Sequence, residues 1–147
     1  MESLSIALGW AGLYGVMALG VIGSIFGCGI AGQAAIGAML ETEGGYGRYF
    51  GVSVMPSSQA IFAIVIMFSL RRPVTVETAP ALFGIGIFAG LALMFSAIIQ
   101  GRTCASAINA FKAKPEIFGL SLAPAAIVEG FAVFTLVFAL VLAGEIP

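Results

Sequence analysis

The chain has 147 residues, of which 61% are hydrophobic and 9% are charged, and its formal net charge is −1. This composition excludes a water-soluble globular domain, and the near-neutral charge excludes a basic surface for nucleic acid. The sequence has no histidine, the most common general base and metal ligand. Cys28 and Cys104 both lie in apolar stretches, where we interpret them as small packing residues.

Residues 3–40 are uncharged and rich in glycine, which predicts the first membrane helix. Gly23 and Gly27 have the spacing that lets two membrane helices approach backbone to backbone. We therefore expect one long, close-packed helix that projects beyond the bilayer. A polar loop follows over residues 41–48, and the uncharged run at 49–70 predicts the second helix.

An Arg-Arg-Pro triplet at residues 71–73 ends the second helix. Thr78 and Pro80 then have the pattern of an N-cap and an early helical proline, which predicts the start of a third helix. That helix extends to about Lys112, a length of about 50 Å at 1.5 Å per residue, so it also protrudes from the bilayer.

A short polar turn at residues 112–116 leads into the last apolar segment, residues 117–142. Glu129 is the only charged residue in that segment, and a carboxylate there costs at least about 2.5 kcal/mol to insert, so it is a candidate functional residue. Four spans place both termini on one side. The inter-helix turns carry Arg48 and two lysines, so the positive-inside rule predicts that both termini are non-cytoplasmic.

The two halves of the chain are related by duplication. A shift of 69 residues aligns residues 31–39 with 100–108, and a shift of 70 aligns residues 59–68 with 129–138. The sequence therefore predicts an all-α integral membrane protein of two tandem transmembrane helical hairpins, a four-helix bundle by duplication. We expect the first hairpin over residues 1–72 and the second over residues 73–147, which carries the ion-binding glutamate.

The positions where the repeat fails are informative. Glu129 is matched by Gln59, and Gln100 is matched by Ala31. Gln100 and Glu129 are equidistant from the centre of the second turn, so a regular hairpin places them at one membrane depth. Because Gln59 is aligned with Glu129 in the repeat, it is expected at the same depth in the first hairpin. Three polar groups are thus expected to converge in an otherwise apolar protein.

The residues around Gln59 add further oxygen atoms to this level. Pro56 lacks an N–H and leaves the carbonyl of Val52 without its usual helical partner, and Ser58 offers a hydroxyl. With Gln59, Gln100 and Glu129 these groups form an all-oxygen set that suits a cation of charge +1, because a divalent ion requires more carboxylates. Without such a cation, desolvation favours protonation of the carboxylate.

Each of these residues also has a structural interpretation when taken alone. Membrane glutamines often serve as hydrogen-bonding contacts between helices, worth about 0.6 kcal/mol. Ser58 can bond to its own helix, and Pro56 can simply kink one. Glu129 itself can be a neutral carboxyl that is retained for packing. The convergence of the four polar groups favours the functional interpretation.

These residues resemble the proteolipid (c or K) subunit of rotary V/A-type ATPases in its four-helix duplicated form. The resemblance covers essentially the whole chain and rests on the glycine-rich first helix, the tandem hairpins, the acid in Ala-Ile-Val-Glu129-Gly-Phe-Ala, and the Gln100-Gly-Arg and Lys112-Ala-Lys-Pro-Glu116 segments. It implies a homo-oligomeric ring that turns in the membrane, in which each Glu129 carries one ion per revolution. ATP is processed on other subunits, so the chain itself is not an enzyme.

The resemblance extends to the sodium-binding branch of that family. It implies Na⁺ ligands at Glu129, Gln100, Gln59 and Ser58, and at the backbone carbonyl of Met55, whereas the proline argument frees the carbonyl of Val52 instead. Ser58 stands in place of a threonine and keeps its hydroxyl. Phe62 stands in place of a tyrosine that bonds to the carboxylate, so that contact is missing.

The resemblance also implies partners. These are a stator membrane subunit with an arginine that faces Glu129, a central-stalk subunit at turns 41–48 and 112–116, and surrounding lipid; no organic cofactor and no nucleic acid are expected. The same rotor carrying H⁺ is the first alternative. A small secondary transporter or channel, and a purely structural membrane scaffold, are the others.

Overall fold

The computed structural model describes residues 1–147 and consists of helices joined by short connections. The elements in chain order are α1 (Glu2–Leu40), α2 (Tyr46–Ser53), η1 (Met55–Ser57), α3 (Ser58–Ser69), α4 (Ala79–Ala113), η2 (Pro115–Ile117), α5 (Phe118–Ser121) and α6 (Ala123–Gly144). The segments that are long and apolar enough to cross a membrane are Glu2–Leu40, Tyr46–Ser69, Ala79–Ala113 and Pro115–Gly144. The predicted all-α membrane fold with four spans is thereby confirmed.

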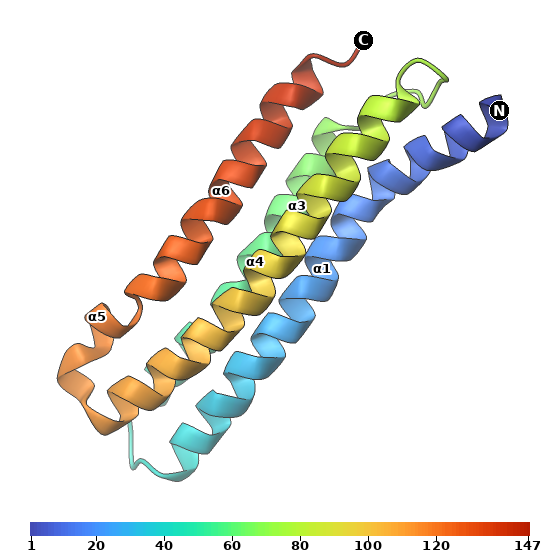
Figure 1. The fold of residues 1–147 in the computed structure, drawn as a ribbon. Helices are drawn as coiled ribbons and strands as arrows, with labels where there is room; N and C mark the ends of the chain where they lie inside the picture. Colours follow the sequence, from blue (N-terminus) through green and yellow to red (C-terminus); the bar gives the residue numbers. More distant parts are fainter.

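The helices form two layers. α1 and α4 run side by side, with α3 and α6 packed against them (Figure 1). α1 contacts α3 and α4 contacts α6, while α3 also contacts α4 and α6. Both chain termini and the connection after α3 lie at one end of the molecule, and the turns within the two hairpins lie at the other end (Figure 1). We call these the terminal end and the turn end.

Glycine makes the close contact between α1 and α4 feasible. A Cβ atom added to Gly86 on α4 would overlap the backbone of Gly12 on α1, and one added to Gly101 would overlap the backbone of Gly27. The backbones therefore touch directly at both ends of the contact, as is typical of small residues between membrane helices. By contrast, Gly29 on α1 faces open space, so only part of the glycine-rich pattern serves packing within the chain.

The second and fourth spans are interrupted, in the second span at the turn that Pro56 is expected to disturb. The second span changes to a 3₁₀ turn over Met55–Ser57, and Pro56 lies in that turn. The fourth span breaks at Leu122, and Pro124 lies in the first turn of the following helix, α6. In both cases a proline removes a backbone donor and clashes with the preceding turn.

Two smaller boundaries also differ from expectation. The loop of the first hairpin is shorter than residues 41–48, because α2 already begins at Tyr46. Thr78 precedes α4, but its side chain does not cap the helix. Its hydroxyl instead donates to the carbonyl of Pro73 at 2.9 Å and accepts from the N–H of Thr75 at 3.0 Å. The side chain of Thr78 therefore stabilises the loop before α4 and does not cap the helix.

The apolar core falls into two clusters. One, of 12 buried residues, lies toward the terminal end and includes Leu13, Ile66 and Leu93. The other, of 9 buried residues, lies toward the turn end and includes Ile108 and Phe111. The polar residues described next lie between the two clusters, so they are shielded from both membrane surfaces.

Candidate ion-binding site

Glu129 lies on α6 and is half-buried on the side that faces α4. Its Oε2 accepts a hydrogen bond from Nε2 of Gln100 on α4. The same nitrogen donates to the carbonyl oxygen of Ala125 at 3.3 Å, one turn earlier on α6. Gln100 therefore joins α4 to α6 at the level of Glu129 and supplies one hydrogen bond to the carboxylate.

Gln59 extends this contact to α3. Its Nε2 donates to Oε1 of Gln100 at 2.8 Å, and both glutamine side chains are 0% exposed. Buried amides need partners on both the donor and the acceptor side, and this bond satisfies the donor of Gln59 and the acceptor of Gln100. The structure thus brings Gln59, Gln100 and Glu129 to one level, where the symmetry of the hairpins predicts them.

Ser58 completes the line of polar side chains. Its Oγ lies 3.1 Å from Oε1 of Gln59 and also 3.1 Å from the carbonyl oxygen of Met55, and it can donate to either. The carbonyl of Met55 belongs to the 3₁₀ turn that contains the buried Pro56 and leads into α3. The turn that contains Pro56 therefore brings a backbone carbonyl, a hydroxyl and an amide oxygen next to one another.

Two serines that the sequence analysis did not identify belong to the same network. Oγ of Ser96 on α4 donates to the carbonyl oxygen of Val128 at 3.3 Å and lies 3.5 Å from Nε2 of Gln59. Oγ of Ser24 on α1 accepts from the N–H of Ala60 at 3.1 Å. Ser96 precedes Gln100 by four residues and so shares its helical face, a signal that could have been used. Ser24 gives no comparable signal.

Phe62 lies one turn after Ser58 and is half-buried. It packs against the apolar cluster of the terminal end and has no polar atom to offer the carboxylate. The oxygen atoms of the network are therefore those of Glu129, the two glutamines, Ser58 and Ser96, together with backbone carbonyls such as those of Met55 and Ala125. These groups are neutral oxygen donors apart from the one carboxylate, and no group of three or more histidine, cysteine or acidic side chains that could hold a metal ion is present.

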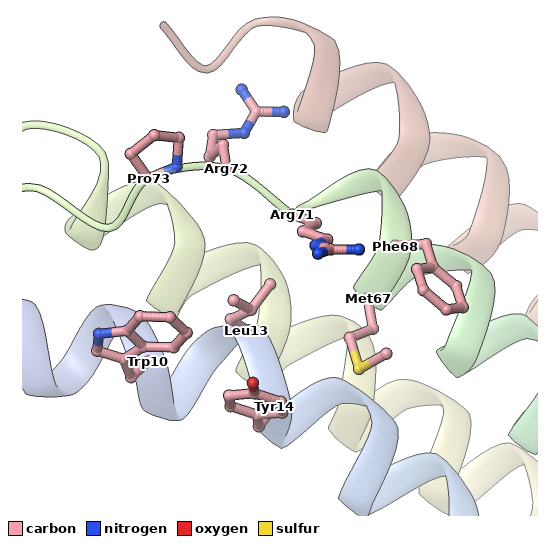
Figure 2. A pocket seen from close by; sticks show the side chains of 8 residues that line it. All are labelled: Trp10, Leu13, Tyr14, Met67, Phe68, Arg71, Arg72 and Pro73. Carbon is pink, nitrogen blue, oxygen red and sulfur yellow. The ribbon is translucent and has the colours of Figure 1, made fainter.

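The grooves on the surface lie apart from Glu129. The largest, about 570 Å³, lies between α1 and the end of α3 at the terminal end, and its lining includes Trp10, Tyr14 and Arg71 (Figure 2). The rings of Trp10 and Tyr14 stack with centroids 5.9 Å apart. Tryptophan and tyrosine gather at membrane–water interfaces, so this groove marks one membrane surface. The polar groups of the site itself are enclosed between helices.

The fold and the site together define a membrane proteolipid built from two tandem hairpins, with the carboxylate of Glu129 held between its helices. The chain belongs to the ATP synthase C-subunit family, whose sequence model matches it twice, over residues 7–70 and 83–142. The two matches coincide with the two hairpins, which agrees with the duplication inferred from the sequence.

Two relatives match most of the chain. The A-type ATP synthase subunit K of Methanocaldococcus jannaschii is 37% identical over 142 residues, which cover 90% of this chain and 62% of that protein. The V-type sodium ATPase subunit K of Enterococcus hirae is 29% identical over 127 residues, which cover 82% of this chain and 81% of that protein. The chain thus spans somewhat less than two thirds of the length of the first relative. Both relatives are named as subunit K of an A-type or V-type complex, so the predicted resemblance is confirmed.

Proposed function

We propose that this chain is a rotor-ring subunit of an A/V-type ATPase or ATP synthase and carries Na⁺ across the membrane on Glu129. As a component of such a complex it has no reaction of its own. The observation that carries the proposal is the line of hydrogen bonds from Ser58 through Gln59 and Gln100 to Glu129, which draws side chains from three helices to one depth. Membership of the ATP synthase C-subunit family supports it.

The line of amides also explains how one carboxylate can alternate between two neutral states. With Nε2 of Gln100 turned toward Glu129, the amide stabilises the carboxyl group. A half-turn of the Gln100 amide would exchange its nitrogen and oxygen atoms and direct its carbonyl oxygen toward a cation at Glu129, and the same turn of Gln59 would keep the two amides bonded. Na⁺ would then be held by Glu129, Gln59, Gln100, Ser58 and the carbonyl of Met55. In either state the charge is neutralised before Glu129 meets lipid.

The proton is the alternative cargo, and Phe62 is the observation that favours it. A phenylalanine cannot donate a hydrogen bond to Glu129. The carboxylate therefore lacks one hydrogen bond that would hold it in place around a bound sodium ion. The oxygen-rich surroundings favour Na⁺, and the name of the E. hirae relative, a sodium ATPase subunit, agrees with that choice. A channel or secondary transporter fits less well, because the polar groups gather at one depth between two apolar clusters.

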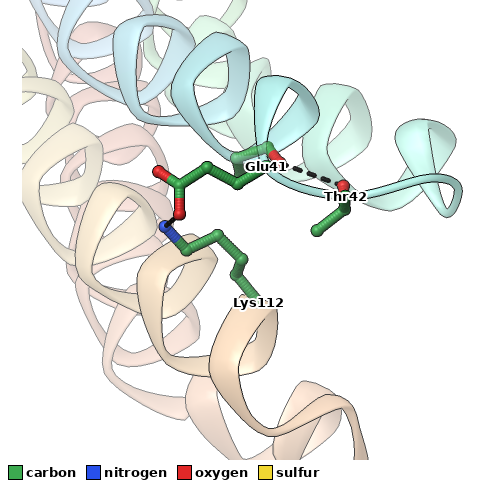
Figure 3. Close-up of polar contacts among 4 residues, drawn as sticks. Glu41, Thr42 and Lys112 are labelled. Atoms are coloured by element: carbon green, nitrogen blue, oxygen red, sulfur yellow. Dashed lines mark hydrogen bonds and ion pairs between the residues drawn. The ribbon is translucent and has the colours of Figure 1, made fainter.

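The proposal includes the partners of a rotor. Copies of this chain form the ring, a stator subunit presents an arginine to Glu129, and a central-stalk subunit binds the cytoplasmic turns at 41–48 and 112–116. Nζ of Lys112 lies 2.8 Å from Oε2 of Glu41 and so links these two turns (Figure 3). A linked pair of turns presents one continuous surface to a stalk subunit, and in this orientation both termini are non-cytoplasmic.

Carbodiimide labelling of Glu129 tests the ion. Carbodiimides react with protonated carboxyl groups in apolar surroundings, so bound Na⁺ should protect Glu129 at fixed pH. We expect labelling to fall as NaCl is raised, while choline chloride at the same ionic strength has no effect. Labelling that ignores sodium but falls as the pH rises would identify a proton rotor. Absence of labelling under all conditions would contradict an accessible membrane carboxyl and with it the rotor proposal.

The variant Glu129→Gln tests the transport role separately. The amide has nearly the same shape as the carboxyl group but cannot release a proton or neutralise a cation. We expect ion transport by the reconstituted complex to be abolished while the amount of assembled ring stays the same. Retained transport would overturn the proposal, and loss of the ring would instead indicate that Glu129 serves packing.

A further inference from the structure

The contact between α1 and α4 within the chain supplies a template for a contact between two copies. The duplication relates the two helices: the shift of 69 residues also aligns Leu13-Tyr-Gly-Val16 with Leu82-Phe-Gly-Ile85. α1 and α4 share the most extensive helix–helix contact of the structure. α4 therefore has a free side that corresponds to the contact side of α1, and α1 has a free side that corresponds to the contact side of α4.

The repeat predicts which residues of two copies would meet if these free sides packed together. Within the chain, a Cβ added to Gly23 on α1 would lie 2.5 Å from the Cα of Met94 on α4. The same contact moved on by one repeat joins Ala92 of one copy to Ile25 of the next. Ala92 is exposed in the single chain, and Ile25 is 64% exposed. The repeat thus leads from a buried contact to two apolar side chains that the chain itself leaves uncovered.

The same step applied nearer the turn end concerns Gly32. Gly101 on α4 packs against the backbone of Gly27 on α1, and the corresponding pair between copies is Ser96 of one copy and Gly32 of the next. Nothing lies within 4 Å of a Cβ added to Gly32, so no contact within the chain requires glycine at this position. A neighbouring helix at close backbone distance would require it.

Toward the terminal end, the free side of α4 borders an apolar groove of about 440 Å³ between α4 and α6, whose lining includes Ile85, Phe88 and Phe138. The contact of Gly86 with Gly12 in the chain corresponds here to Met17 of the next copy against Ala81. Methionine takes far more room than glycine, and its flexible side chain fills irregular gaps. Two copies are therefore expected to approach most closely at Gly32 and to be held further apart at Met17.

We propose that a second copy packs its α1 on the free side of α4 in the register set by the repeat, with the closest approach at Gly32. The inference rests on the rotor ring proposed above and specifies how its copies meet. One chain provides both surfaces, so each copy binds one neighbour through α1 and another through α4. A contact of this head-to-tail kind produces a ring when the rotation between copies closes.

Disulfide cross-linking in membranes tests the register. In a background with Cys28→Ser and Cys104→Ser, the pair Ala92→Cys and Ile25→Cys should join neighbouring copies under a mild oxidant, because a disulfide requires Cα atoms no more than about 7 Å apart. A ladder of covalent oligomers on a denaturing gel, with a matching loss of monomer, measures it. Ala92→Cys with Phe26→Cys is the matched control. Phe26 is 59% exposed, but it points about 100° away from Ile25 around the helix.

The control pair should remain monomeric. Equal ladders from both pairs, a ladder from the control pair alone, or no ladder from either pair would each overturn the proposed register.

Gly32→Leu tests the closest approach, with Gly29→Leu as its matched control. Both glycines lie on α1 and face open space in the single chain, but only Gly32 lies in the proposed contact. We expect native mass spectrometry to show loss of the ring for Gly32→Leu and an unchanged ring for Gly29→Leu, with equal helical content by circular dichroism. A ring that persists in Gly32→Leu would overturn the inference and leave the rotor proposal standing. A wild-type protein that forms no ring would overturn both.

Discussion

Oε1 of Gln100 accepts a hydrogen bond of 2.8 Å from Nε2 of Gln59, which lies 41 residues earlier in the chain, and both side chains are fully buried. This contact joins the two halves of the duplication. Gln59 occupies the position that corresponds to Glu129 in the second hairpin. A carboxylate there could only accept hydrogen bonds, and it would repel a second acid nearby. The amide both accepts and donates, so it can link Ser58 to Gln100.

The first prediction concerns the coupling between these two amides. Gln100→Leu removes the hydrogen bonds to Gln59 and Glu129 and leaves the buried Gln59 and the half-buried Glu129 without their main partner. We expect a loss of about 1–3 kcal/mol in the free energy of unfolding, the usual penalty for a buried unsatisfied polar group. Thermal or denaturant unfolding in a mild detergent measures it.

The double variant Gln59→Leu/Gln100→Leu supplies the control. When one amide has already been replaced, replacing the other removes no further bond between them. The double variant should therefore lose less free energy of unfolding than the two single variants together, by about 0.5–3 kcal/mol, the usual range for contacting residues. Strict additivity would show that the two amides do not interact in the folded protein.

The second prediction concerns the contact between α1 and α4. A Cβ on Gly86 would lie 2.9 Å from the Cα of Gly12 and still closer to its carbonyl group. These are backbone atoms, which cannot move aside as a flexible side chain can, so the helices must separate. Gly86→Ala should destabilise the protein by about 1–3 kcal/mol, as overpacking of a close contact usually does.

Gly84→Ala is the matched control, because Gly84 lies on the same helix and faces open space. It should leave the midpoint of thermal unfolding unchanged or slightly raised, since alanine favours the helix. Equal effects of the two substitutions would contradict close backbone contact between α1 and α4.

The four spans and the level of the site could be predicted from the sequence because both depend on simple periodic features. Apolar length determines which segments cross a bilayer, and the fixed rise of a helix relates Gln100 to Glu129 across their turn. The duplication then places Gln59 beside them. None of these steps requires knowledge of how the side chains are oriented.

The breaks at Met55–Ser57 and Leu122 could not be predicted from hydropathy. Prolines in membrane helices are often tolerated with little distortion, because neighbouring groups satisfy the freed backbone atoms. Here the N–H of Ala60 finds its partner in Ser24 on another helix, a contact that only the packed structure reveals. The direction of the hydrogen bonds between the amides likewise depends on all partners at once, so composition and spacing leave it open.

The third prediction concerns the ion pair between Lys112 and Glu41. The carboxylate is exposed, with 65% of its side chain accessible, and an exposed pair typically contributes only about 0.2–1 kcal/mol. Lys112→Gln should therefore change the stability of the isolated subunit very little at physiological salt. If these turns bind a stalk subunit, the same variant should weaken that association instead, which a binding measurement between the ring and the stalk can detect. A large loss of stability would mean that the pair holds the two hairpins together.

The fourth prediction concerns Arg72, whose guanidinium joins the ends of two helices. It donates to the carbonyl oxygen of Ser69 at the end of α3 at 3.2 Å, and to those of Ala143 and Ile146 at the end of α6 at 2.8 and 2.5 Å. A cation at helix C-termini is favourable, and hydrogen bonds to charged groups contribute about 1.5–3 kcal/mol each. We expect Arg72→Gln to lower the free energy of unfolding by at least about 1.5 kcal/mol, and amide hydrogen exchange to rise at the C-terminal end of α6.

Arg71→Gln is the comparison for this last prediction. Arg71 is the neighbouring residue, carries the same charge and is exposed, and in Figure 2 its guanidinium lies toward Phe68 while that of Arg72 points toward the end of the chain. Its removal changes the net charge equally but breaks none of the bonds to α6, so exchange there should stay at the wild-type rate. Lysine at position 72 should restore only part of the stability, because an ammonium group lacks the planar fork that reaches three carbonyls from two helices. If Arg71→Gln and Arg72→Gln raised hydrogen exchange in α6 equally, the change would come from the loss of positive charge alone. The guanidinium of Arg72 would then have no specific role in joining α3 to α6.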